Sequence, residues 1–263
     1  MDALLAQLAP QALVFLMIAA RISAMMAVAP VFSSRSFPVR VKAAFVVILS
    51  YVALPVVGGS VALPESLSAV SVGLLIGKEI LVGLAFGFVA QMLFAAVQFA
   101  GGLIDIGAGF AIANVLDPAA NLNLTLLGRF YNLVATSAFL AIGGHQLLVA
   151  GVVKSFDFIP PTEMPALGTV VAGIAGQADD ILLVAIMIGA PILVALFVSD
   201  IALGILARAV PQMNVFIVGL PLKIVIALAG MAILLPTTMG FFSDLTGRMF
   251  GDLSDIIRAS GGG

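Results

Sequence analysis

The sequence has no cysteine, no tryptophan and a single histidine, His145. Without cysteine the chain can form neither a disulfide nor a thiolate metal site, and it has no thiol nucleophile. One histidine cannot form a two-histidine metal site, and the sequence also lacks the G-x-S-x-G elbow and the phosphate-cradling patterns. We therefore expect His145 to be a hydrogen-bonding or helix-end residue, and the chain to have no catalytic residue, metal site or cofactor.

Charge is also scarce, because only 9% of the 263 residues are charged while 62% are hydrophobic. A soluble domain carries about 25% charged residues, so this chain could not cover a surface that faces water. The formal net charge of −2 gives no indication of a nucleic-acid partner. The composition predicts an integral membrane protein, or a subunit buried among other apolar subunits.

Six apolar stretches are long enough to span a bilayer, and some contain Pro or Gly; they lie at 10–32, 43–63, 69–99, 124–150, 181–207 and 224–242. Continuous apolar runs of this length argue against a transmembrane β-barrel, whose strands alternate. The first run has no basic residues before it and is too long for a signal peptide, so we interpret it as a retained helix. The predicted fold class is an all-α membrane protein with about six long helices, partly broken.

Lysine and arginine in short loops predict the orientation of the chain. The loop 33–42 holds Arg35, Arg40 and Lys42, and the loop 208–223 holds Arg208 and Lys223. Because cytoplasmic loops are enriched in basic residues, both loops are expected to face the cytoplasm and both termini to face outward.

Charged residues inside apolar runs are costly in lipid and usually face a partner or a cavity; there are five, Arg21, Lys78, Glu79, Arg129 and Asp200. Lys78 and Glu79 are adjacent and point about 100° apart on a helix, so they are not expected to share a face. Their partners should then lie on other segments. Two interpretations stay open: ion pairs between helices or subunits, or an ion-coupling site.

Polar and small residues mark two possible faces of the third apolar run. Gln91, Gln98 and Asp105 recur every seven residues, so they form one polar stripe if the helix continues through 105. The glycine pairs 73/77 and 83/87 are four residues apart and permit close helix contact. The stripe either bonds to neighbouring helices or faces a wet lumen.

The stretch "QFAGGLIDIGAGFAIANVLDP" (98–118) is apolar and glycine-rich, yet it holds two aspartates. Four glycines within 101–109 make a poor helix interior, at roughly 1 kcal/mol each. We therefore expect an apolar, bendable loop over 100–123 between two long helices. Irregular backbone at membrane depth must be enclosed by protein or line a cavity. The loop is predicted to be a buried re-entrant connection or a gate.

A second stretch, "RAVPQMNVFIVGLPLK" (208–223), has proline near both ends and basic termini. It is interpreted either as a short interfacial helix or as a docking turn for a cytoplasmic partner.

Three segments together resemble the FliR family of flagellar export-gate proteins and its counterparts in virulence type III secretion. The turn at 208–223 carries the match at Pro211, Gln212, Asn214, Phe216, Gly219, Pro221 and Lys223. The segment 27–44 carries it at Pro30, Phe32, Pro38, Arg40 and Lys42. The stretch 98–118 carries it at Gln98, Gly101, Asp105, Gly109, Phe110, Asp117 and Pro118. The resemblance covers about 10–245.

The resemblance implies a core subunit of an export gate at the bacterial inner membrane, in the flagellar basal body and displaced toward the periplasm. One such subunit joins five FliP and typically four FliQ subunits in a helical, conical assembly, with FlhB and FlhA at the cytoplasmic side. Unfolded flagellar proteins pass through its centre. The implied parts of this chain are a FliP-like region (1–175), a FliQ-like helical hairpin (176–245) and a polar C-terminal tail (246–263).

The resemblance also implies that 106–119 acts as a plug across the closed pore. The expected plug residues are Ile106, Gly107, Gly109, Phe110, Asn114, Asp117 and Pro118, with Gln91, Gln98 and Asp105 beside the polar path. The cytoplasmic turn is expected to contact partners through Arg208, Pro211, Gln212, Asn214, Phe216, Pro221 and Lys223. Alternatives are the equivalent subunit of a virulence injectisome, a small-solute secondary transporter using Lys78, Glu79 and Asp200, and an intramembrane hydrolase.

Overall fold

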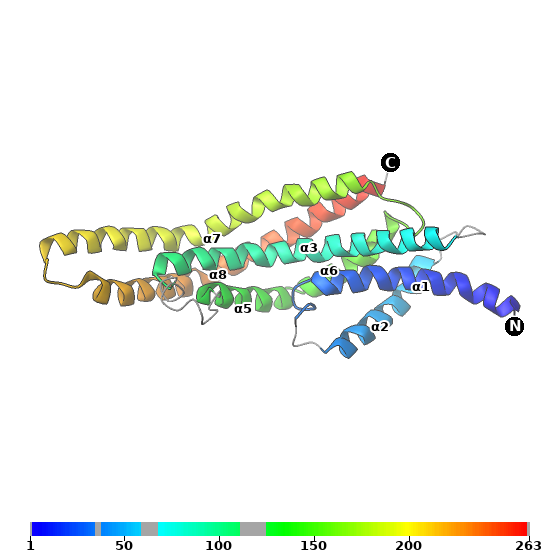
Figure 1. Ribbon diagram of the computed structural model, residues 1–263, viewed down its shortest axis with the longest axis horizontal. Helices are drawn as coiled ribbons and strands as arrows, with labels where there is room; N and C mark the ends of the chain where they lie inside the picture. The colour runs from blue at the N-terminus through cyan, green and yellow to red at the C-terminus, as the bar shows by residue number, and fades with distance from the viewer. Residues whose placement is uncertain (1, 35–37, 59–67, 111–124, 262–263) are drawn as a thin grey trace. The chain divides into compact units, whose positions relative to one another are not determined.

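The computed structural model describes residues 2–34, 38–58, 68–110 and 125–261. Every regular element within these ranges is helical, which confirms the predicted all-α fold class (Figure 1). The elements are α1 Asp2–Val28, α2 Val39–Gly58, α3 Ala69–Ala108, α5 Leu126–Ala141, α6 Gly144–Lys154, the 3₁₀ turn η2 Ser155–Asp157, α7 Leu167–Ala209 and α8 Val215–Gly261.

Five of the described helices are long and apolar enough to cross a membrane. The sixth expected span is a bent pair, because α5 and α6 meet at 64° across a short break. Gly143 in that break has φ +73°, a left-handed conformation that glycine adopts without steric cost. The expectation of about six long helices, partly broken, is therefore confirmed.

The prediction of a bendable loop beginning at residue 100 is wrong for 100–108, because α3 continues through Ala108. Close packing against α5 explains the helix despite its glycines. A Cβ atom on Gly101 would lie 2.5 Å from the Cα of Gly128, so only glycine allows the two backbones to meet there. This contact, within one compact part of the chain, offsets the low helix propensity of glycine.

The interpretation of 208–223 as a short interfacial helix is also wrong. Asn214 Oδ1 accepts hydrogen bonds from the backbone N–H groups of Phe216 (3.1 Å) and Ile217 (3.4 Å), which caps a helix starting at Val215. That helix is α8, and it runs without a break to Gly261. Residues 246–261 therefore continue α8, although they carry most of the polar tail expected from the sequence.

The chain divides into two compact units. Unit 1 comprises 1–92, 143–178 and 246–263, and unit 2 comprises 93–142 and 179–245. The division predicted from the family resemblance (1–175, 176–245 and 246–263) concerns relationships to other proteins, and it stays a prediction.

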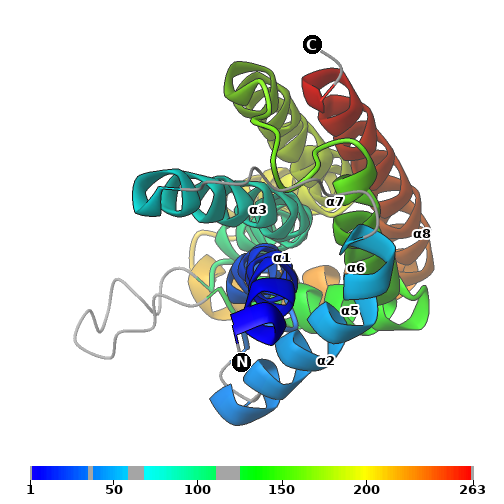
Figure 2. The same ribbon diagram turned by 90° about the vertical axis from the view of Figure 1, so that its right-hand side faces the viewer.

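In unit 1, α1 lies between α2 and the first half of α3 (Figures 1 and 2). Gly83 and Gly87 allow α3 to approach α1 closely, because a Cβ on Gly83 would meet the carbonyl oxygen of Arg21 and one on Gly87 would lie 2.7 Å from the carbonyl oxygen of Met25. Gly73 and Gly77 have no described atom within 4 Å of such a Cβ. The expectation of close contact is therefore correct for one glycine pair only.

In unit 2, aromatic rings connect three helices. Phe94 of α3 meets Phe139 of α5 and Phe242 of α8 edge to face, with ring centroids 5.4 and 5.6 Å apart. Edge-to-face geometry directs the positive edge of one ring at the negative face of another, so these contacts add to the apolar burial.

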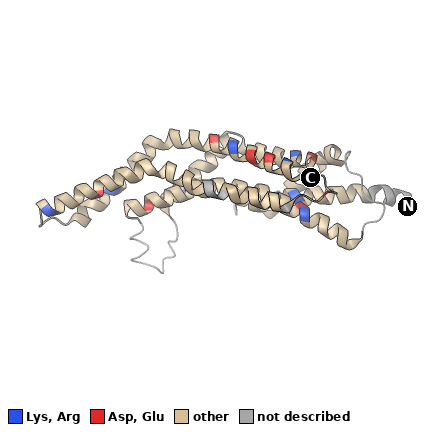
Figure 3. Ribbon diagram, turned by 90° about the horizontal axis from the view of Figure 1, so that it is seen from above, with Lys and Arg blue, Asp and Glu red and all other residues tan. Residues whose placement is uncertain are grey.

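Large apolar side chains are exposed along most helices, including Tyr51 (72%) on α2, Phe197 (65%) on α7 and Ile233 (76%) on α8. Figure 3 shows that long parts of the helices carry no charge, while acidic and basic residues lie close together near the end of α8. An apolar surface of this extent requires lipid or other protein to cover it.

Candidate functional site

A buried charge cluster, formed by Arg21, Lys78 and Glu79, connects α1 to α3 in unit 1. Arg21 Nε donates to Glu79 Oε2, and Lys78 Nζ lies 2.7 Å from Glu79 Oε1. None of the three residues is more than 3% exposed. Partners on other segments were expected for Lys78 and Glu79, but the pair between these two neighbours was not; it forms because the long lysine side chain carries Nζ back to its neighbour's carboxylate.

The buried charge cluster also holds the segment 155–163 that follows α6. Arg21 donates to Ser155 Oγ (2.8 Å) and to the carbonyl oxygen of Ile159 (3.0 Å), and its guanidinium lies 3.6 Å from the centre of the Phe156 ring. The cluster therefore has partners on a distant segment, as its position in an apolar run suggested.

Lys78 completes the attachment of this segment through three backbone carbonyl groups. Its Nζ donates to Pro160 (2.8 Å), Pro161 (2.9 Å) and Glu163 (3.1 Å). The sequence analysis did not single out these acceptors. The signal was the Pro160–Pro161 pair, because neither proline has a backbone N–H and a helix is not expected to continue through them. Carbonyl groups outside a helix can accept a side-chain donor such as Lys78.

The other two predicted buried charges lie elsewhere. Asp200 of α7 pairs with Lys223 of α8 in unit 2, with Oδ1 and Nζ 2.6 Å apart and the aspartate side chain 50% exposed. Lys223 was expected only as part of the cytoplasmic turn. Arg129 is exposed on α5 and pairs with no residue in the described part of the chain.

The polar stripe has mixed exposure. The helix α3 continues through Ala108. Its three polar residues at seven-residue spacing, Gln91, Gln98 and Asp105, therefore lie on one face of the helix. Both glutamines are exposed, whereas Asp105 is 3% exposed. The carboxylate of Asp105 accepts the backbone N–H of Leu127, at 3.1 Å from each oxygen, in the first turn of α5. A carboxylate at a helix start satisfies free N–H groups and complements the helix dipole.

The first residues of the predicted plug fall at the end of α3. Ile106 is exposed, and a Cβ on Gly107 would lie 3.1 Å from Leu196 of α7. Gly109 has φ +88°, and the N–H of Phe110 donates to the carbonyl oxygen of Asp105 (3.0 Å), which ends the helix. Asn114, Asp117 and Pro118 lie outside the described residues.

The turn 208–223, predicted to be cytoplasmic, lies in unit 2, where it joins α7 to α8. Arg208 is in the last turn of α7, and Pro211, Gln212 and Pro221 are exposed. Phe216 is 80% exposed, next to the capping residue Asn214.

The described ranges contain no group of three or more His, Asp or Glu that could hold a metal ion. His145 Nδ1 is buried, with no hydrogen-bond partner among the described residues. The charged groups that the structure brings together bind other groups of the chain, so they hold its segments together.

Comparison with known proteins gives a family match. The model of "Bacterial export proteins, family 1" matches residues 12–249. The Flagellar biosynthetic protein FliR of Bacillus subtilis (strain 168) is 38% identical over 217 residues, which are 81% of this chain and 82% of that protein. The protein of the same name from Escherichia coli (strain K12) is 31% identical over 237 residues, 90% of each chain.

A relative with a different name matches a shorter part. The Yop proteins translocation protein T of Yersinia pestis is 33% identical over 156 residues, which are 59% of this chain and 60% of that protein.

Proposed function

Because the chain belongs to the FliR family of bacterial export proteins and is a membrane component of a type III export apparatus, we propose that it is a core subunit of the flagellar export gate. With FliP and FliQ it forms a closed conduit through which unfolded flagellar proteins cross the inner membrane. The flagellar role is preferred to that of a virulence injectisome, since the flagellar relatives match 81% and 90% of the chain and the Yop protein only 59%.

The proposal rests on one observation: apolar surface is exposed on helices whose length exceeds the thickness of a bilayer. The helices α3, α7 and α8 have 40, 43 and 47 residues. At about 1.5 Å per residue each is roughly 60 Å long or more, about twice the ~30 Å hydrocarbon core. Apolar side chains beyond the bilayer need protein partners, which supports a subunit that works inside a larger assembly. We propose that this assembly is displaced toward the periplasm.

We further propose that 106–119 is a movable plug in this conduit. Two contacts within unit 2 support the proposal, because they fix the helices that flank this segment. The carboxylate of Asp105 holds the start of α5, and Gly101 meets Gly128. An apolar segment with both ends fixed can seal a pore and still move between its ends. The exposed Gln91 and Gln98 mark the polar path beside it.

The chain also has partners in this proposal. The turn at 208–223 contacts FlhB and FlhA at the cytoplasmic side, and one copy of this chain joins five FliP and about four FliQ subunits. The subunit is not an enzyme. A secondary transporter is less well supported, because Lys78 and Glu79 are buried and already pair with each other and with groups of the chain itself.

Deletion of 107–114 tests the plug. In cells that also produce FliP and FliQ, the deletion should make the inner membrane permeable to small ions, measured as loss of membrane potential. The matched control is the same deletion in cells without FliP and FliQ, where no conduit forms and the potential should hold. An unchanged potential in cells whose assembled gate contains the deletion would falsify the plug proposal.

A further inference from the structure

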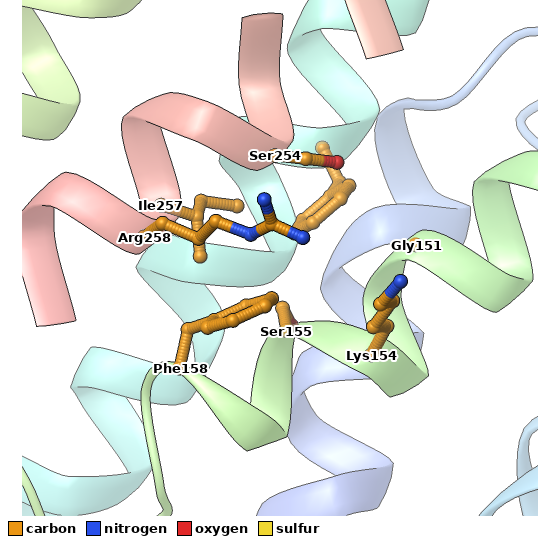
Figure 4. Close-up of a pocket in the computed structure, with 8 residues that line it drawn as sticks. Gly151, Lys154, Ser155, Phe158, Ser254, Ile257 and Arg258 are labelled. Carbon is orange, nitrogen blue, oxygen red and sulfur yellow. The ribbon is translucent and has the colours of Figure 1, made fainter. Parts of the chain in front are cut away.

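A recess between α6 and α8 in unit 1 brings two basic side chains together (Figure 4). Its volume is about 30 Å³, against the ~10–15 Å³ that one ordered water requires. Eight residues line it: Phe86, Gly151, Lys154, Ser155, Phe158, Ser254, Ile257 and Arg258. The recess is therefore large enough for a small polar group and has two cations at its edge.

Neither cation has a strong partner in the described part of the chain. Arg258 lies with its guanidinium carbon 4.8 Å from the centre of the Phe158 ring, which holds the group in place. Its carboxylate neighbour, Asp255, is 3.8 Å away, and both side chains are more than half exposed. Lys154 forms no hydrogen bond or ion pair with any described residue. Two cations beside one recess repel each other, and an anion between them would relieve this repulsion.

The two serines cannot provide the anion's donors, because their hydroxyl protons are already used. Ser155 Oγ donates to the carbonyl oxygen of Val152 (2.6 Å) and accepts from Arg21. Ser254 Oγ donates to the carbonyl oxygen of Phe250 (2.9 Å). Recognition of an anion therefore depends on Lys154 and on Arg258, whose planar guanidinium matches a carboxylate in two parallel hydrogen bonds.

The face of α8 that leads to the recess is open. Gly247, Gly251 and Ser254 are spaced four and three residues apart, so they lie on one side of the helix. A Cβ on either glycine would have no described atom within 4 Å. Small residues at this spacing allow the backbone of another helix to approach closely.

The charge of this part of α8 favours protein over lipid. Acidic and basic residues lie close together along it (Figure 3): Asp244, Arg248, Asp252, Asp255 and Arg258. Charged side chains at this density are uncharacteristic of a lipid-facing helix.

We propose that this recess binds an aspartate or glutamate carboxylate of another polypeptide, whose helix packs on the Gly247–Gly251 face of α8. The inference rests on the proposed function, in which the chain works inside an assembly of export subunits. Beyond that function, the proposal identifies a docking site on this chain and requires the partner to place a negative charge there.

Charge reversal tests the site in the full chain, produced with its partner subunits and purified in detergent. Lys154→Glu and Arg258→Glu should each lower the amount of partner subunit recovered per chain at least about tenfold, as expected when a carboxylate faces a like charge. The matched control is Arg248→Glu, an equal charge change on the exposed surface of α8 outside the recess. Native mass measurement gives both the subunit ratio and any bound lipid.

Gly251→Leu provides a second test that does not depend on charge. Leucine should raise helix propensity and leave the chain at least as resistant to heat, yet it should block the approaching helix and lower the partner ratio. If the partner ratio is unchanged in the Lys154, Arg258 and Gly251 variants, the docking site is refuted. Loss of a bound phospholipid with an unchanged partner ratio also refutes it. Failure of the unsubstituted chain to recover any partner contradicts the proposed function instead.

Discussion

Glu79 is the residue on which the buried charge cluster depends, because its carboxylate pairs with both buried cations, Arg21 and Lys78. Replacing it with glutamine would keep the shape of the side chain but remove the negative charge that the two cations share. Removing one partner of a buried ion pair costs about 3–5 kcal/mol. We predict that Glu79→Gln lowers the free energy of unfolding by this amount, measured by chemical unfolding in detergent.

The matched control for Glu79→Gln is Asp200→Asn, which breaks the ion pair with Lys223. That pair is half-exposed at its aspartate, so its loss should cost no more than about 1 kcal/mol. Equal losses of stability for the two variants would show that burial does not increase the contribution of the charge cluster to the free energy of unfolding.

Glycines determine how closely the helices pack. Gly101 and Gly73 both lie inside α3, but a Cβ on Gly101 would lie 2.5 Å from the Cα of Gly128, while one on Gly73 would have no described atom within 4 Å. We predict effects of opposite sign. Gly101→Ala should force α3 and α5 apart and cost about 1–3 kcal/mol, whereas Gly73→Ala should stabilise the chain by about 0.5–1 kcal/mol through helix propensity.

Thermal unfolding of the two alanine variants in the same detergent measures this difference directly. A stabilising effect at both positions would mean that α3 and α5 do not meet backbone to backbone. The result would also remove one of the two contacts that fix the ends of the proposed plug.

At the scale of the whole molecule, the exposed apolar surface predicts dependence on partners. Produced without FliP and FliQ, the chain should yield several-fold less monodisperse protein than it does with them, measured by size-exclusion chromatography in detergent. The physical reason is that apolar side chains beyond the bilayer would otherwise contact water or one another. An unrelated inner-membrane protein produced in the same cells should be unaffected, and an equal yield of monomer without partners would contradict the prediction.

The sequence predicted the features that depend on local pattern. Long apolar runs predict helices in a membrane, because lipid leaves each backbone N–H and carbonyl group to bond within its own segment. The same logic identified Arg21, Lys78 and Glu79 as charges that need partners. It failed at 100–108, where glycine propensity predicted a loop and contact with Gly128 stabilises a helix.

Composition and hydrophobic pattern by themselves determined that this chain is an all-α membrane protein, and its three motifs indicated the family. Only the tertiary structure decided how the polar groups are used: that 155–163 supplies the acceptors for Arg21 and Lys78, that Asp105 caps α5, and that Lys154 and Arg258 share a recess. The physical reason is distance along the chain. Helix formation depends on residues three or four apart, whereas these contacts join residues separated by 22 to 138 positions, and only folding brings them together.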